Sequence, residues 1–212
     1  MRKIEKGEEP ASLIAWKSAN PKGRYNALSD VERKDIRQAC TKEQFYLCAY
    51  CCQPVSGSKE DTANEHVEAQ DLAKNRTLDF GNIVASCRAP RQCDGSHGSQ
   101  PLPLTPLMPE CEVELRFKPS GRVEGLTDRA KAAIQVLNLG DTEANNKALI
   151  EKRKRLCDVL LWSSYGAPVD QLDHEDEDLL RILIEDISTP KAGRLAPFAP
   201  VLANILRAKL LA

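Results

Sequence analysis

The chain has 212 residues, and 30 Lys and Arg against 31 Asp and Glu give it a formal net charge of -1 at pH 7. This length allows one large domain or two small ones with a real hydrophobic core. The balanced charge excludes nucleic-acid binding through overall charge alone, so any such contact must come from local patches or from a partner. No stretch approaches the roughly 18 apolar residues of a membrane span, so no membrane contact is expected.

The chain contains eight cysteines. Its opening residues, Met1 to Lys3, do not lead into the apolar segment of a secretion signal, so we expect a cytoplasmic protein with reduced thiols. In that compartment, clustered cysteines and histidines indicate a metal site. Scattered ones such as Cys40, Cys111 and Cys157 are more typical of a core.

The first part of the chain predicts an arm followed by a helix. Residues 1–28 are charged and interrupted by prolines and a glycine, which favours an extended or partly helical arm rather than a packed element. The arm could lie on its own chain or contact a partner. Ser29 and Glu32 have the spacing of a capping box, which predicts a helix over residues 30–42.

Short strands are expected around the cysteines. Residues 45–54 are β-prone and aromatic, which favours a tight turn between two short strands. Residues 64–68 predict another strand, and residues 79–86 lead toward the next cysteines. Four prolines between positions 101 and 109 make a stiff connector and a candidate domain boundary.

The part beyond the connector is expected to be mostly helical. Alternating apolar and polar residues flank a turn, which predicts a β-hairpin over residues 111–117 and 122–126. Capping residues and apolar periodicity predict four helices, over residues 130–139, 142–163, 173–187 and from Pro197 or Pro200 to about Leu210. His174 is expected to belong to a solvated acidic helix start.

These elements predict a mostly helical α+β fold. We expect three segments: an N-terminal arm over residues 1–28, a central core over residues 29–100, and a region over residues 101–212 that holds the connector, the hairpin and the C-terminal helices.

The stretch from residue 48 to residue 97 holds five of the eight cysteines. Cys48 and Cys51, then Cys87 and Cys93, offer four thiolates from two loops, which is typical of a closed tetrahedral zinc site that stabilises a fold. Cys52 could replace Cys51, although the two-residue spacing favours Cys51. The alternative interpretation is four buried free thiols.

Polar residues that could carry out hydrolysis lie among these cysteines. Glu65 and His66 come between the two pairs, Asn82 precedes the second pair, and Asp94 and His97 follow it. An imidazole can take a proton from water, carboxylates can hold a hard cation, and an amide can orient the imidazole. A Glu-His pair alone is more often incidental, but its place between two cysteine pairs favours a functional site.

In this order and spacing the sequence resembles the HNH endonuclease family in its four-cysteine form. The resemblance implies a zinc-clasped ββα-metal motif, with His66 as general base, Glu65 and Asp94 as ligands of a catalytic Mg²⁺ or Mn²⁺, and Asn82 fixing His66. His97 stands where such members often have a Lys, so the resemblance implies contact with the metal or the scissile phosphate; a surface-loop role is the alternative. Glu65 replaces the commoner Asp, and Asp94 stands where Asn or His is more usual.

The opening residues and the sequence around Asn82 also resemble one HNH subfamily, found as the nuclease subunit of Septu and retron-associated antiphage defence systems. That resemblance implies a bacterial defence effector that acts on DNA or RNA and binds an ABC-type ATPase. Arg88 and Arg91, in the second cysteine loop, are the favoured nucleic-acid contacts. A run from Arg153 to Arg155 is a weaker candidate, because charge runs are usually solvated. The alternative function is a catalytically silent, zinc-stabilised interaction or regulatory module.

Overall fold

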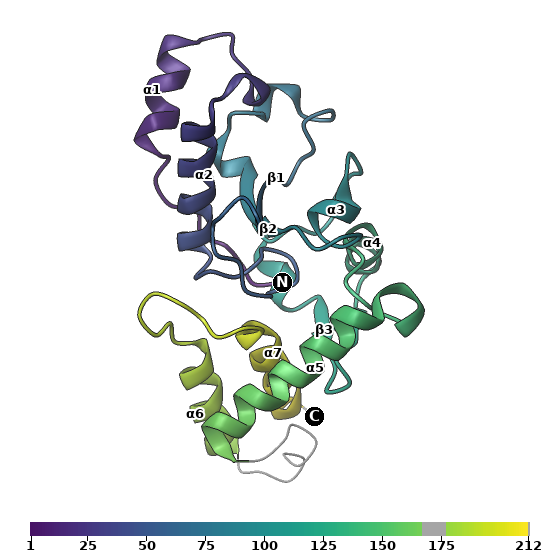
Figure 1. Cartoon of the computed structure of the whole chain (residues 1–212). Coiled ribbons are helices and arrows are strands. Elements are labelled where there is room, and N and C mark those ends of the chain that lie inside the picture. The colour runs from purple at the N-terminus through teal and green to yellow at the C-terminus, as the bar shows by residue number, and fades with distance from the viewer. Residues whose placement is uncertain (167–176, 212) are drawn as a thin grey trace.

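A computed structural model describes residues 1–166 and 177–211 of the chain. Within these residues the fold is α+β and mostly helical, with seven α-helices and two antiparallel sheets of two strands each (Figure 1). The predicted fold class is therefore confirmed. The α-helices and strands are, in chain order, α1 (Ala11–Ala19), α2 (Asp30–Glu43), β1 (Thr62–His66), β2 (Ile83–Cys87), α3 (Asp94–His97), β3 (Leu115–Phe117), β4 (Val123–Gly125), α4 (Asp128–Leu137), α5 (Glu143–Tyr165), α6 (Glu177–Ser188) and α7 (Ala199–Leu210).

Helix α2 begins where its capping residues predict. The Ser29 side chain accepts a hydrogen bond from the backbone N–H of Val31, and the Glu32 carboxylate accepts one from the backbone N–H of Ser29 at 2.9 Å. The predicted span of residues 30–42 is confirmed to within one residue. Against one side of α2 packs α1, and fully buried Leu13 of α1 joins Ile36 of α2 in a small core that continues into β2.

The N-terminal segment is partly helical and lies on its own chain, as the sequence allowed, so only the expectation that it is not a packed element is wrong. Met1 and Ile4 are buried in the larger hydrophobic core, and the backbone N–H of Ile4 donates to the carbonyl of Pro106 at 2.8 Å. Figure 1 shows the N-terminus in the middle of the molecule. Isolated apolar residues in a charged stretch gave no periodic signal, but Met1, Ile4 and Leu13 are buried in the chain's own cores.

Strands β1 and β2 form the hairpin that carries the candidate site. Thr62 of β1 pairs with Cys87 of β2, and His66 pairs with Ile83. Glu65 and His66 therefore lie at one end of the hairpin, and Cys87 lies at the other. Helix α3 follows as a single turn of four residues, which gives the expected ββα order with a very short helix.

The larger core continues from this hairpin into the C-terminal part of the chain. Strands β3 and β4 form the predicted second hairpin, although each is only three residues long. The backbone N–H of Cys93 donates to Leu137 of α4 at 2.9 Å, and that of Phe198 donates to Cys52 at 3.0 Å. The division into three segments stays a prediction. One hydrophobic core contains residues from all three segments and crosses both expected boundaries.

The C-terminal helices follow the predicted pattern where they are described. Helices α4, α5 and α7 lie within a few residues of their predicted bounds. Helix α6 is described from Glu177 onward, so the predicted start at residue 173 and the interpretation of His174 lie outside the described residues. Among the described helices, none has the length and apolar character needed to cross a membrane.

Candidate functional site

The two predicted cysteine pairs meet in the structure. The Sγ atoms of Cys48, Cys51, Cys87 and Cys93 all lie within 4.8 Å of one another, and all four residues are buried. The Sγ atoms of Cys51 and Cys87 are 3.9 Å apart. A tetrahedral zinc with Zn–S distances of about 2.3 Å requires sulfurs roughly 3.8 Å apart, so this donor set fits the ion. The buried four-cysteine cluster suggests a structural zinc.

The loop that carries the first pair is closed by a single β-bridge between Leu47 and Pro54 rather than by the two strands expected there. Within it, the backbone N–H of Cys48 donates to the carbonyl of Gln53 at 2.8 Å, and that of Cys52 donates to Cys48 at 3.1 Å. This turn directs Cys51 into the cluster. Cys52 is buried outside the ligand group, as the two-residue spacing favours.

Burial and hydrogen bonds shift the pKa values of the clustered thiols in different directions. Burial alone would raise the pKa of Cys48, but hydrogen bonds from the other three thiols bring it well below the ordinary value. Burial raises the pKa of Cys51 and Cys93 well above that value. The Gln92 amide donates to Cys87 Sγ at 3.5 Å and to Cys51 Sγ at 3.8 Å. Donors of this kind orient metal ligands and stabilise their negative charge.

Three of the polar residues predicted for the site, Glu65, His66 and Asp94, line a cleft of about 350 Å³. Glu65 and His66 enter it from the end of β1, and Asp94 enters it from the start of α3. Among the described residues, only the four cysteines bring three or more potential ligand atoms within 4.8 Å. The ligand atoms of Glu65, His66 and Asp94 are therefore less closely grouped than the sulfurs of the four cysteines.

The tautomer of His66 follows from its hydrogen bond. Nε2 of His66 lies 2.9 Å from the backbone carbonyl of Thr77, which can only accept, so Nε2 carries the proton and Nδ1 keeps its lone pair. The Tyr25 ring packs edge-on against the imidazole, with centroids 4.7 Å apart. Burial lowers the pKa of His66, which favours the neutral ring. This is the state that a general base requires.

Glu65 is held by two buried side chains. Its Oε1 lies 2.5 Å from Nδ1 of His97 and accepts a hydrogen bond from the Tyr50 hydroxyl at 3.3 Å. The pKa of Glu65 is raised to about 7, chiefly by burial and also by the nearby Asp94 carboxylate, while the hydrogen bond to His97 opposes the increase. The closeness of Asp94 shows that the two carboxylates face one region of the cleft.

His97 lies behind Glu65 and does not line the cleft. Its side chain is fully buried, and its second nitrogen, Nε2, donates to the carbonyl of Gln100 at 2.8 Å. Although burial lowers its pKa, the bond to Glu65 produces a net increase. Both ring nitrogens are hydrogen-bonded, to Glu65 and to Gln100, so neither is available for a metal or a phosphate as expected. The alternative of a surface-loop residue also disagrees with the structure, because His97 is buried.

Asn82 acts on the backbone after His66 rather than on the imidazole. Its Oδ1 accepts from the backbone N–H of Glu68 at 2.8 Å, and its Nδ2 donates to the Glu68 carbonyl at 3.0 Å. The backbone N–H of Val67 donates to the Asn82 carbonyl at 2.9 Å. The expectation that Asn82 contacts His66 is corrected: Thr77 holds the ring, and Asn82 holds the chain that follows it.

The arginines predicted as nucleic-acid contacts differ in exposure and in whether they line a cleft. Arg88 is exposed and lines a second, larger cleft beside the first, whereas Arg91 is exposed but lines neither cleft. Arg153 is fully buried and donates to the carbonyls of Gly121 and Leu139 at 2.6 Å and 3.0 Å. The interpretation of Arg153 as a nucleic-acid contact is therefore wrong.

Sequence reasoning missed three residues that organise the site: Tyr25, Thr77 and Gln92. Thr77 acts through its backbone carbonyl, so its side chain carries no signal of the role. Tyr25 reaches His66 from the segment between α1 and α2. Gln92 lies between the cysteines of the second pair, and this position was the available signal for a residue close to the metal.

Comparisons with known proteins agree with the resemblance. The chain is 29% identical over 96 residues to an Escherichia coli protein named as the candidate HNH endonuclease of retron Ec83. The match covers 41% of this chain and 37% of that protein, so the similarity spans little more than a third of the relative's length. No protein-family model matches the chain. The distant relative and the buried four-cysteine cluster together confirm the predicted resemblance to zinc-binding HNH endonucleases.

Proposed function

We propose that the chain is a metal-dependent HNH endonuclease that hydrolyses phosphodiester bonds in nucleic acid. The observation that carries this proposal is the gathering of Glu65, His66 and Asp94 in one cleft, on the hairpin and short helix that the cysteine cluster joins. The cysteine clasp stabilises the fold, since four thiolates leave no open position for a substrate.

His66 is the general base. Thr77 fixes Nε2 as the donor, so Nδ1 takes the proton from the attacking water. Asn82 keeps the adjoining backbone in place through Glu68. The imidazole therefore needs no rearrangement to accept a proton.

Glu65 and Asp94 hold the catalytic cation. Two carboxylates that face one region suit a hard ion such as Mg²⁺ or Mn²⁺, which would stabilise negative charge on the phosphate and leaving oxygens. His97 and Tyr50 both bind Oε1 of Glu65, so the carboxylate is held in one orientation. Because the two groups repel each other without a cation, binding one relieves an unfavourable arrangement.

The name of the Escherichia coli relative supports a further part of the proposal. A chain similar to a candidate retron endonuclease fits the role of nuclease effector in bacterial antiphage defence, as in Septu or retron systems. In that role the chain would work beside an ABC-type ATPase in the cytoplasm. The partner would supply control and part of the nucleic-acid contact that a chain of net charge -1 lacks.

Cation binding and cleavage together test the proposal. Purified protein of measured zinc content is incubated with plasmid DNA and with RNA, alone and with its ATPase partner, with and without added Mg²⁺. We expect cleavage only with added Mg²⁺, at unchanged zinc content. Mn²⁺ binding, followed by electron paramagnetic resonance, should be lost in Glu65→Gln and in Asp94→Asn.

The matched control is Asp71→Asn. Asp71 also lines the cleft but is exposed and bound to Ser99 at 2.7 Å, so its charge can be removed without touching the proposed ligands. Mn²⁺ binding that weakens equally in all three variants would indicate a general charge effect. Stoichiometric zinc without Mn²⁺ binding or cleavage would instead support the catalytically silent module. In such a module the contact between Glu65 and His97 would have a structural role only.

A further inference from the structure

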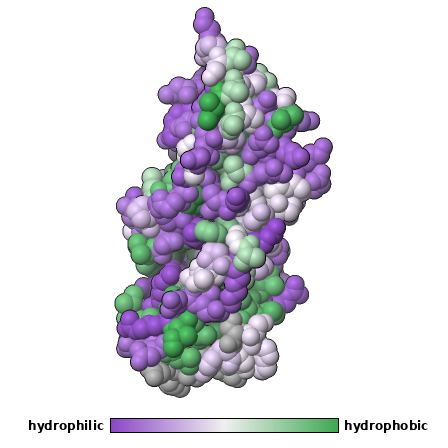
Figure 2. Space-filling view, turned by 90° about the vertical axis from the view of Figure 1, so that its left-hand side faces the viewer, coloured by the Kyte–Doolittle hydropathy of each residue, from purple (hydrophilic) through white to green (hydrophobic). Residues whose placement is uncertain are grey.

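A second and larger cleft, of about 790 Å³, adjoins the cleft that Glu65, His66 and Asp94 line. Helix α2 forms one wall, and the loop of residues 56–60 with β1 forms the other. Asn64 and Asp94 line both clefts, so the two are continuous at the point where the proposed chemistry takes place. Figure 2 views the face of the molecule that carries α1 and α2, and hydrophilic residues cover most of it.

The larger cleft concentrates positive charge. Five of its lining residues are basic and three are acidic, a local balance of +2 in a chain whose total is -1. The basic residues are Arg33, Lys34, Arg37, Lys59 and Arg88. Among the described residues, none of the five has a carboxylate partner within 4.0 Å. Their charge is available to an anion.

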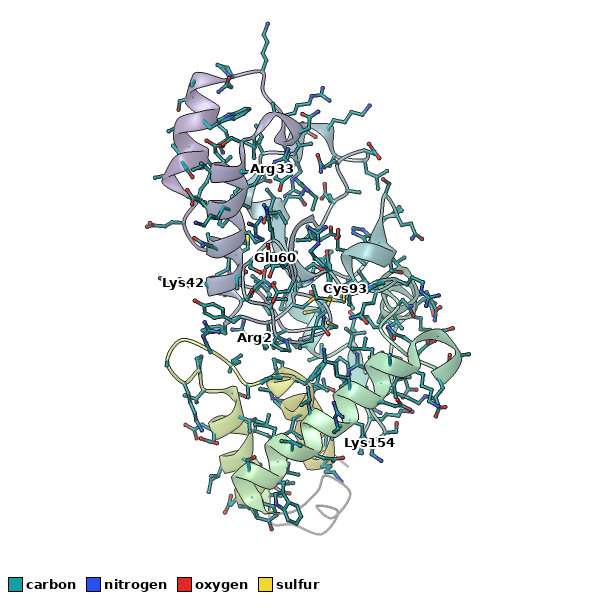
Figure 3. All side chains as sticks on the ribbon, in the orientation of Figure 1. Arg2, Arg33, Lys42, Glu60, Cys93 and Lys154 are labelled. Carbon is teal, nitrogen blue, oxygen red and sulfur yellow. The ribbon has the colours of Figure 1, made fainter. Side chains whose placement is uncertain are left out.

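Two of these cations are held in place by backbone carbonyls. Arg37 donates from Nε to Gly57 at 3.0 Å, and Arg33 donates from Nη2 to Asn26 at 2.9 Å. The two arginines are four residues apart, so they lie one turn apart on the same face of α2. Nε of Arg33 and Oδ1 of Asn64 are buried without a hydrogen-bond partner among the described residues. Figure 3 labels Arg33 of α2 and Glu60 of the 56–60 loop, which both line the cleft.

We propose that this cleft binds the sugar-phosphate backbone of the substrate strand and guides it to Glu65, His66 and Asp94. A phosphodiester approaching two carboxylates is repelled, so cations beside them are needed to hold it. The guanidinium and ammonium groups along α2 and the 56–60 loop provide such cations, and the shared lining residues give a continuous path. This inference rests on the proposed function and names the surface that binds its substrate.

Binding by a cleavage-deficient chain tests the inference. Fluorescently labelled single-stranded DNA, duplex DNA and single-stranded RNA are titrated with full-length His66→Ala protein. The same titration is made with Lys34→Gln and Lys59→Gln added together. Both lysines are exposed, and neither side chain forms an ion pair with the described residues that its replacement would break. We expect roughly tenfold weaker binding at low salt and a salt dependence less steep by about one unit for each phosphate that is no longer bound.

The control replaces two exposed basic residues elsewhere, Lys154 and Arg155 of α5, by Gln. Figure 3 labels Lys154 on α5, away from the cleft. Equal weakening by both pairs, unchanged binding by the Lys34 and Lys59 pair, or no binding of any oligonucleotide would overturn the inference. The oligonucleotide whose binding depends on the cleft identifies the substrate class.

Failure of the inference and failure of the proposed function give different results. Cleft-dependent binding without cleavage by the His66-containing protein would contradict the nuclease and support the binding surface. Mg²⁺-dependent cleavage together with oligonucleotide binding that the Lys34→Gln and Lys59→Gln changes do not weaken would support the proposed nuclease function. It would overturn the proposal that the cleft binds the substrate.

Discussion

His66 owes its chemical state to groups that are distant in the sequence. Thr77 sets its tautomer through a backbone carbonyl, and Tyr25 packs against its ring. Residue type and order predicted His66 as the general base, and this role stays a prediction, whereas the groups that hold its ring depend on how the chain returns to it. Side-chain patterns do not encode a backbone carbonyl contact, so Thr77 could not be predicted.

Asn82 is expected to matter for stability as well as for activity. It is almost fully buried, and both ends of its amide bind the backbone of Glu68. Asn82→Ala removes both of these part-buried hydrogen bonds, each worth about 0.5–1.5 kcal/mol, so the free energy of unfolding should fall by about 1–3 kcal/mol. Urea unfolding of the zinc-loaded protein measures it. An unchanged unfolding midpoint would contradict the structural role assigned to Asn82.

Gln92 should tune the affinity of the clasp for zinc. Its amide donates to two of the four sulfurs, and removing such a donor typically weakens metal binding by about 10–100-fold. Gln92→Leu should therefore lose zinc to a competing chelator at lower chelator concentration than wild type. Gln135→Leu, the same change at an exposed position on α4, is the control. Equal zinc retention by both variants would exclude this role for Gln92.

At the scale of elements, local sequence patterns predicted the helices and strands that form through local interactions. The capping box placed the start of α2, and the alternation around a glycine turn predicted the β3–β4 hairpin. Helix α1 and the buried N-terminal segment were missed, because their few apolar residues pack against distant elements. Residues 45–54 form a turn closed by one bridge instead of two strands, and this turn carries Cys48 and Cys51 to the four-cysteine cluster.

The clasp joins the loop after α2 to the end of β2 and the start of α3. Cys87→Ser removes one ligand of a closed site, so the variant should lose its zinc and the cooperative unfolding of the hairpin region. Cys157→Ser makes the same change at a buried cysteine of α5 outside the cluster. We expect that control to keep its zinc, as measured by metal analysis after gel filtration. Full zinc retention by Cys87→Ser would remove Cys87 from the ligand set.

At the scale of the molecule, one core extends from Met1 to Leu206. The proposed central segment is bound to the C-terminal part through hydrogen bonds from Cys93 to Leu137 and from Phe198 to Cys52. Sequence reasoning placed a boundary at the proline connector because composition changes there. Composition reports local stiffness but not the burial of apolar residues across the connector, such as fully buried Leu104.

This continuity predicts that the first two proposed segments, residues 1–100, do not fold without the third. A fragment of residues 1–100 exposes the apolar surface that the C-terminal part covers, so it should lack a cooperative urea transition and bind zinc more weakly than the full chain. Circular dichroism and chelator competition on both proteins measure this. A fragment that unfolds cooperatively and binds zinc as tightly as the full chain would instead support an independent domain.

The central claim is that the clasp stabilises the fold while the cleft beside it performs hydrolysis through His66. Its most direct test is the rate of Mg²⁺-dependent cleavage by His66→Ala and by wild type, each alone and with the proposed ATPase partner, at equal zinc content. We predict a decrease of about 10²–10⁴-fold, the usual contribution of a general base, with zinc content and unfolding midpoint close to those of wild type. Cleavage by His66→Ala at the wild-type rate would contradict the claim.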